Sequence, residues 1–88
     1  MQITREEVYS LIDLERSYQE KWDSGNYPGR VKDKDKEVET WLSAMRVYLH
    51  RAEEAALDPN KTAALDNLRK VLALGVACME FHGAPTRN

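Results

Sequence analysis

The feature that most constrains the fold is a run of apolar and small residues from Val71 to Met79, which directly follows the charged stretch from Asp66 to Lys70. At 100° per residue, its large side chains and the leucines before them fall on two flanks of a helix, one with Leu65, Leu68, Leu72 and Met79 and the other with Val71, Leu74 and Cys78. Such a helix needs neighbours on at least two sides, supplied by the other helices or by a second copy. Because one small core in 88 residues is only marginally stable, we favour the second copy and expect a homo-oligomer.

The same helix keeps one polar strip. It carries Asp66, Arg69 and Lys70 and continues over Ala73 and Ala77. The two alanines leave room beside the charges, so we expect a ligand there.

The rest of the chain also has helical periodicity and no strand signals, which predicts a single all-α domain over residues 1–88. The expected helices cover about 5–22, 35–57 and 59–82, with a loop over 23–34. Thr4 and Glu7 fit a capping box at the first helix. Asp58 followed by Pro59 fits the cap and first position of the third.

Charge and length exclude several classes. The chain has 13 basic and 15 acidic residues, which does not indicate a protein that binds extended DNA or RNA. The apolar run from Val71 to Met79 is too short to span a bilayer, and the N-terminus lacks the layout of a signal peptide. We therefore expect a cytoplasmic protein without a membrane partner.

Glu15 breaks the pattern of the first helix. It projects from the middle of the apolar stripe, with Gln19 one turn further at the same edge. A carboxylate in that position needs partners. It either ligates a metal or accepts hydrogen bonds from a ligand, or it forms an inward salt bridge to an arginine such as Arg16, Arg46 or Arg69.

The second helix carries a polar strip beside its apolar face. The strip comprises Glu39, Ser43, Arg46, His50 and Glu53, with Glu54 just beyond it. These side chains could face one cleft, with Arg46 and His50 as ligand-binding residues. The alternative for His50 is an ordinary contact with Arg46, Glu53 or Glu54 on the same helix.

The loop before the second helix is locally basic. Arg30, Lys32, Lys34 and Lys36 alternate there with Asp33 and Asp35, next to Tyr27. Tyr27 could stack on a base while Arg30 and the lysines meet phosphate. The alternative is a solvated linker.

Three segments resemble small phage-encoded proteins of the MazG-like all-α group. They are the string from Glu15 to Trp22, the start of the second helix around Trp41, and the stretch from Leu68 to Pro85. The likeness covers most of the chain. It implies an oligomeric helical bundle that binds Mg²⁺ with acids of two helices and hydrolyses nucleoside triphosphates.

The sequence departs from that family where the metal should bind. Glu53 and Glu54 are present, but Leu57 replaces the acid expected after them. On the next helix the family's ExxD pattern falls on Asn67 and Lys70. A lysine there can meet phosphate directly with its own charge, which favours binding over hydrolysis.

The residue patterns, together with what the resemblance implies, leave three functions open. The first is a non-enzymatic nucleotide-binding protein without a cofactor, such as a phage anti-defence sponge for a cyclic or modified nucleotide signal in the host cytoplasm. Its expected ligand-binding residues are Glu15, Gln19, Tyr27, Arg30, Arg46, His50, Arg69 and Lys70. The second is a Mg²⁺-dependent pyrophosphohydrolase whose metal is held by Glu15, Glu53, Glu54 and Asp66. The third is a phage helical adaptor that binds a host protein.

Overall fold

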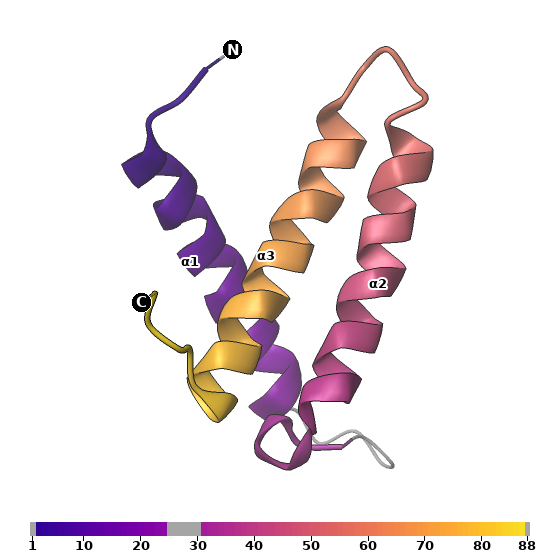
Figure 1. Cartoon of the computed structure of the whole chain (residues 1–88). Helices are drawn as coiled ribbons and strands as arrows, with labels where there is room; N and C mark the ends of the chain where they lie inside the picture. The colour runs from indigo at the N-terminus through magenta and orange to yellow at the C-terminus, as the bar shows by residue number, and fades with distance from the viewer. Residues whose placement is uncertain (1, 25–30, 88) are drawn as a thin grey trace.

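The computed structural model describes residues 2–24 and 31–87, and over these residues the chain is helical and has no strand. Three α-helices and one short 3-10 helix follow in the order α1 (Arg5–Ser24), η1 (Asp33–Asp35), α2 (Val38–Ala55) and α3 (Thr62–His82) (Figure 1). This confirms the all-α class. None of the helices is long and apolar enough, among the described residues, to cross a membrane.

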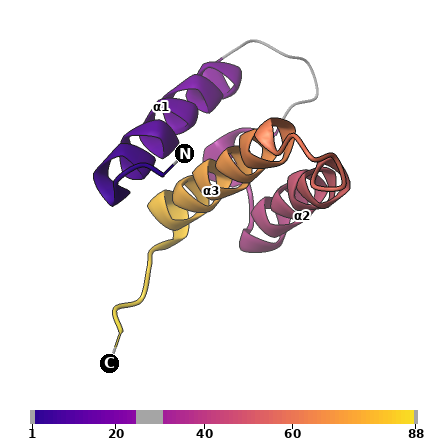
Figure 2. The ribbon, with the colours of Figure 1, turned by 90° about the horizontal axis from the view of Figure 1, so that it is seen from above.

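The third helix lies between the other two. Figure 2 shows α3 flanked by α1 on one side and by α2 on the other, and α3 packs against both. α2 and α3 form an antiparallel hairpin, which α1 approaches at an angle. Two neighbours of α3 therefore come from the same chain. The sequence favoured a second copy for this role over the other helices.

The buried apolar core is small. Its members among the described residues are Trp41, Ala52, Val71, Ala73 and Ala77. Trp41 stacks on Phe81 with ring centroids 6.1 Å apart, and Lys36 Nζ lies 4.5 Å from the Trp41 ring centre. These contacts fasten the start of α2 to the end of α3.

The start of α1 is capped as the sequence predicted. The backbone N–H of Glu7 donates to Thr4 Oγ1 at 3.1 Å, and the backbone N–H of Thr4 donates to Glu7 Oε1 at 3.3 Å. This reciprocal pair is a capping box.

The third helix starts three residues later than predicted, and Asp58 does not cap it. Asp58 Oδ1 instead accepts the backbone N–H of Asn60, and Asn60 Oδ1 accepts that of Thr62. Short polar side chains often form such turns with the backbone two residues ahead. They place Pro59 in the connection rather than at the first helical position, and α2 accordingly ends at Ala55 rather than residue 57.

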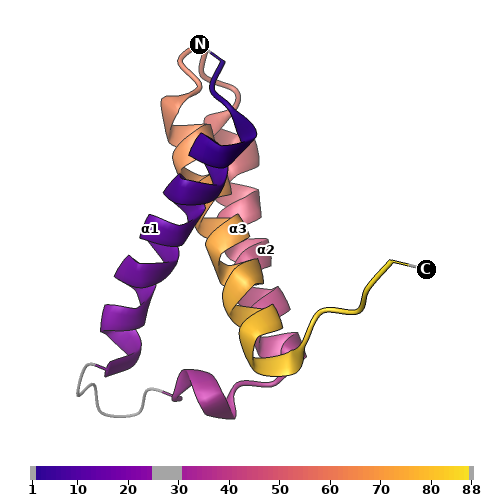
Figure 3. The same cartoon turned by 90° about the vertical axis from the view of Figure 1, so that its left-hand side faces the viewer.

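The short helix η1 overlaps the end of the predicted loop and the first residue of the predicted second helix, and α2 begins at Val38 instead of residue 35. Asp23 at the end of α1 holds this segment, because its Oδ1 accepts the backbone N–H of Asp33 at 2.8 Å and its carbonyl accepts Lys32 Nζ at 2.8 Å. Figure 3 shows η1 between the lower end of α1 and the start of α2.

Candidate functional site

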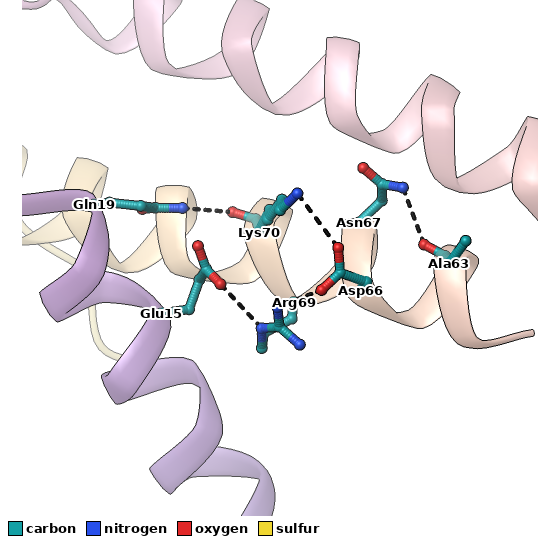
Figure 4. Close-up of polar contacts among 7 residues, drawn as sticks. All are labelled: Glu15, Gln19, Ala63, Asp66, Asn67, Arg69 and Lys70. Atoms are coloured by element: carbon teal, nitrogen blue, oxygen red, sulfur yellow. Dashed lines mark hydrogen bonds and ion pairs between the residues drawn. The ribbon is translucent and has the colours of Figure 1, made fainter. Parts of the chain in front are cut away.

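Glu15 lies in an ion pair between α1 and α3. Its side chain is 9% exposed, and Arg69 Nε donates to Glu15 Oε1 at 3.0 Å (Figure 4). In the structure this carboxylate therefore forms the inward salt bridge, which was one of the two interpretations drawn from the sequence.

The pair extends along α3. Asp66 Oδ1 accepts a second hydrogen bond from Arg69, and Lys70 Nζ lies 3.3 Å from Asp66 Oδ2. Gln19 Nε2 donates to the Lys70 carbonyl at 3.4 Å. Two carboxylates thus face two cations, so this network joins α1 to α3 without an excess charge that would attract a phosphate.

The network shifts two pKa values. Burial raises the pKa of Asp66, but hydrogen bonds from Arg69 and Lys70 and their charges outweigh it, so the pKa lies below the ordinary 3.8. The hydrogen bond to Glu15 raises the pKa of Arg69 despite burial, with a further contribution from Asp66.

We expect Asp66 to make stability depend on pH in the acid range. Because its pKa is lower in the folded state, its stabilisation is present above the unfolded pKa of about 3.9 and is lost as pH falls through the folded value. Asp66→Asn should therefore cost at most about 1 kcal/mol at pH 7, since the side chain is 41% exposed and water screens the pair.

Urea titrations from pH 7 down to pH 2.5 would measure this difference. It should shrink toward zero at the acid end, whereas Asp13→Asn, at an exposed position of α1, should show little difference at any pH. A constant deficit for Asp66→Asn would show that its charge is not the cause.

The alanines of the polar strip leave no room for a ligand. Ala73 and Ala77 are both 0% exposed. They share the side of α3 that carries Arg69 and Glu80, whose partners Glu15 and Arg16 lie on α1. The packing of α3 against its neighbours therefore closes the space that the sequence predicted over these two alanines.

The polar strip of α2 lies elsewhere. Arg46, His50, Glu53 and Glu54 line a separate open cavity of 580 Å³ that does not include Lys70. His50 Nε2 lies 2.6 Å from Glu54 Oε1, one turn away on the same helix. Arg46 and Lys70, both expected to bind the ligand, therefore do not line this cavity together, and His50 makes the ordinary contact within its helix.

The acids named for a magnesium site are not brought together. Glu15 and Asp66 pair with Arg69, while Glu53 and Glu54 lie on α2 in the separate cavity. Among the described residues, no group of three or more His, Cys, Asp or Glu side chains is placed to hold a metal ion. Asn67 donates to the Ala63 carbonyl at 2.9 Å within α3.

A different cavity is lined by residues of every described helix, and its polar groups come from α1, η1, Lys36 and α2. It has a volume of 230 Å³ and is lined by Arg16, Gln19, Trp22, Asp33, Lys36, Trp41, Tyr48 and Leu74. Two buried polar atoms in its lining, Gln19 Oε1 and Trp41 Nε1, have no hydrogen-bond partner in the described protein. Two residues of one lining therefore each carry a buried polar atom without a partner, an acceptor on Gln19 and a donor on Trp41.

The charges of this cavity are largely buried. Arg16 and Asp33 are 5% and 4% exposed. Arg16 Nε donates to Glu80 Oε1 at 3.0 Å, and Lys36 Nζ donates to Asp33 Oδ1 at 2.8 Å. Arg16 also lies 3.9 Å from Glu20 Oε1, so both cations of the lining are paired with carboxylates.

Of the residues that line this cavity, the sequence patterns predict ligand contacts for Gln19 and for Lys36, the latter as one of the loop lysines. Helical periodicity places Trp41 on the apolar face of its helix. That placement gives no sign that its indole N–H needs a hydrogen-bond partner. Asp33 was one of several alternating loop charges, and only its burial in the structure distinguishes it. Tyr27 and Arg30, the proposed loop contacts, lie outside the described residues.

Comparison with protein-family models, with curated proteins and with solved structures finds no match to this chain.

Proposed function

We propose that this chain is a non-enzymatic nucleotide-binding protein whose ligand enters the cavity between Gln19 and Trp41. The observation that supports this most is the pair of buried unpartnered atoms, an acceptor and a donor, in one lining. The edge of a nucleobase presents donors and acceptors side by side. A buried polar atom without a partner costs about 1–3 kcal/mol, and a ligand that satisfies both atoms recovers that energy.

The charge and size of the cavity suit part of a nucleotide. Its lining offers an anion two cations, Arg16 and Lys36, each of which also pairs with a carboxylate. Its volume of 230 Å³ is below the ~300–1,000 Å³ of pockets that enclose a drug-sized ligand. A base would therefore enter and the phosphates would remain at the mouth, where Trp22 is 43% exposed.

The proposal is binding without hydrolysis. Asn67 and Lys70 stand where the resembled family has metal-binding acids, and Arg69 occupies both Glu15 and Asp66. Binding without hydrolysis suits a protein that sequesters a nucleotide signal. The resemblance suggests that such a protein would be a phage-encoded sponge in the host cytoplasm. We include assembly into a homo-oligomer in this proposal.

The experiment has two stages. The purified chain is heated, and the small molecules released from it are identified by mass spectrometry. ATP and cyclic di-AMP are then titrated into the chain by calorimetry, with and without Mg²⁺. We expect binding of at least one phosphorylated nucleotide and no release of pyrophosphate from ATP.

Trp41→Phe tests the site, because it removes the indole N–H and keeps an aromatic ring on Phe81. We expect nucleotide binding about 3- to 10-fold weaker, the effect of one neutral hydrogen bond. Arg46→Ala and His50→Ala serve as controls in the other cavity and should bind normally.

The proposal fails if neither nucleotide binds and heating releases none, which would leave a cavity whose polar atoms are satisfied by water. If Arg46→Ala weakened nucleotide binding and Trp41→Phe left it unchanged, the ligand would lie in the cavity on α2. Magnesium-dependent release of pyrophosphate at about 1 per second or more would identify the enzyme instead.

A further inference from the structure

An apolar groove of 540 Å³ lies between α1 and the first half of α3. The described residues that line it are mostly aliphatic: Ile3, Val8, Leu11 and Ile12 on the α1 side and Leu65, Leu68 and Leu72 on α3, with Thr62, Asp66 and Arg69 beside them. The two helices diverge at this end of the molecule (Figure 1). The groove is separate from the polar cavity, and nothing below depends on nucleotide binding.

The apolar surface continues beyond the groove along both helices. On α1, Leu11, Leu14 and Tyr18 share one side at helical spacing and are 45%, 66% and 53% exposed. On α3, the stripe of Leu65, Leu68, Leu72 and Met79 is 40% to 61% exposed. The other helices of the chain thus cover both stripes only in part.

The area of the chain indicates what covers them. It exposes 7053 Å², whereas a globular monomer of 10.1 kDa exposes about 5,300 Å². The excess of about 1,750 Å², to which the exposed residues 83–87 after α3 also contribute, is of the size of the ~1,000–2,500 Å² that each partner buries in an obligate homodimer. The chain therefore exposes enough area for a stable dimer interface.

We propose that a second copy of this chain occupies the groove. The α1 stripe of Leu11, Leu14 and Tyr18 packs against the α3 stripe of the partner, and a two-fold axis makes the contact reciprocal. α1 and α3 of both copies then form a four-helix core, and the two α2 helices lie outside it. The interface would then lie on the flank of α3 that carries Leu65, Leu68, Leu72 and Met79, and not on the flank that carries Leu74 and Cys78.

Cysteine pairing between separately tagged chains tests this arrangement. One chain carries Leu14→Cys and the other Leu72→Cys, both with Cys78→Ala, and they are mixed, refolded together and oxidised mildly. We expect a mixed disulfide as the main product, because a disulfide needs the two Cα atoms within about 7 Å. Tyr9→Cys, on another side of α1, should give little mixed disulfide with Leu72→Cys.

Sedimentation of the whole chain supplies the second measurement. Leu14→Glu should raise the dissociation constant of the dimer by about tenfold or more, while Leu57→Glu, 87% exposed at the end of α2, should leave it unchanged. A wild-type chain that is monomeric at micromolar concentration would overturn the proposal and leave the groove to a different protein. An oligomer with no Leu14–Leu72 mixed disulfide would overturn it as well.

Discussion

Replacing Arg69 by alanine is expected to lower the free energy of unfolding by about 2–4 kcal/mol. The Glu15 carboxylate is 9% exposed and accepts its hydrogen bond from Arg69 Nε. Without the guanidinium, a nearly buried charge between α1 and α3 loses its partner, and breaking a buried pair typically costs 3–5 kcal/mol. The expected loss is somewhat smaller because Arg69 itself is 37% exposed.

Urea denaturation at pH 7 would measure this loss, and a double variant separates its causes. In Glu15→Gln with Arg69→Met, neither charge remains, so most of the lost stability should return. Arg51→Ala removes an arginine of α2 that lies over the Tyr48 ring, and it should cost clearly less. A double variant as unstable as Arg69→Ala would show that the side chain of Arg69 acts through packing rather than charge.

Replacing Ala73 by leucine is expected to destabilise the fold by about 2–3 kcal/mol, at the upper end of the range for overpacked cores. Ala73 is 0% exposed and lies one turn beyond Arg69 on the side of α3 that meets α1. A leucine there would push α1 outward and lengthen the contacts of Glu15 and Gln19 with α3. Thermal unfolding and urea denaturation would both report the change.

Ala63→Leu is the matched control, because Ala63 is an exposed residue of the same helix. It should change stability by no more than about 0.5 kcal/mol. If Ala73→Leu proved as stable as Ala63→Leu, α1 would not approach α3 closely at this position. The ion pair of Glu15 would then have to be formed across a wider gap.

Local patterns in the sequence were enough to predict the helical class and one helix cap. Capping at Thr4 and Glu7 depends on residues three apart, and the periodicity of each helix is likewise a property of adjacent turns. The start of α3 was missed because two turn-forming side chains, Asp58 and Asn60, competed with the helix for the same backbone donors. The sequence alone does not decide that competition.

The candidate site depended on which helices meet. The sequence identifies Glu15 as a carboxylate that needs a partner, but it does not distinguish between the three possible arginines. The packing of α1 against α3 makes Arg69 the partner. The separation of Arg46 from Lys70, and the cavity that leaves Gln19 and Trp41 unpaired, likewise depend on long-range packing. Periodicity assigns a side chain to a face of its own helix, whereas only the tertiary structure determines what that face contacts.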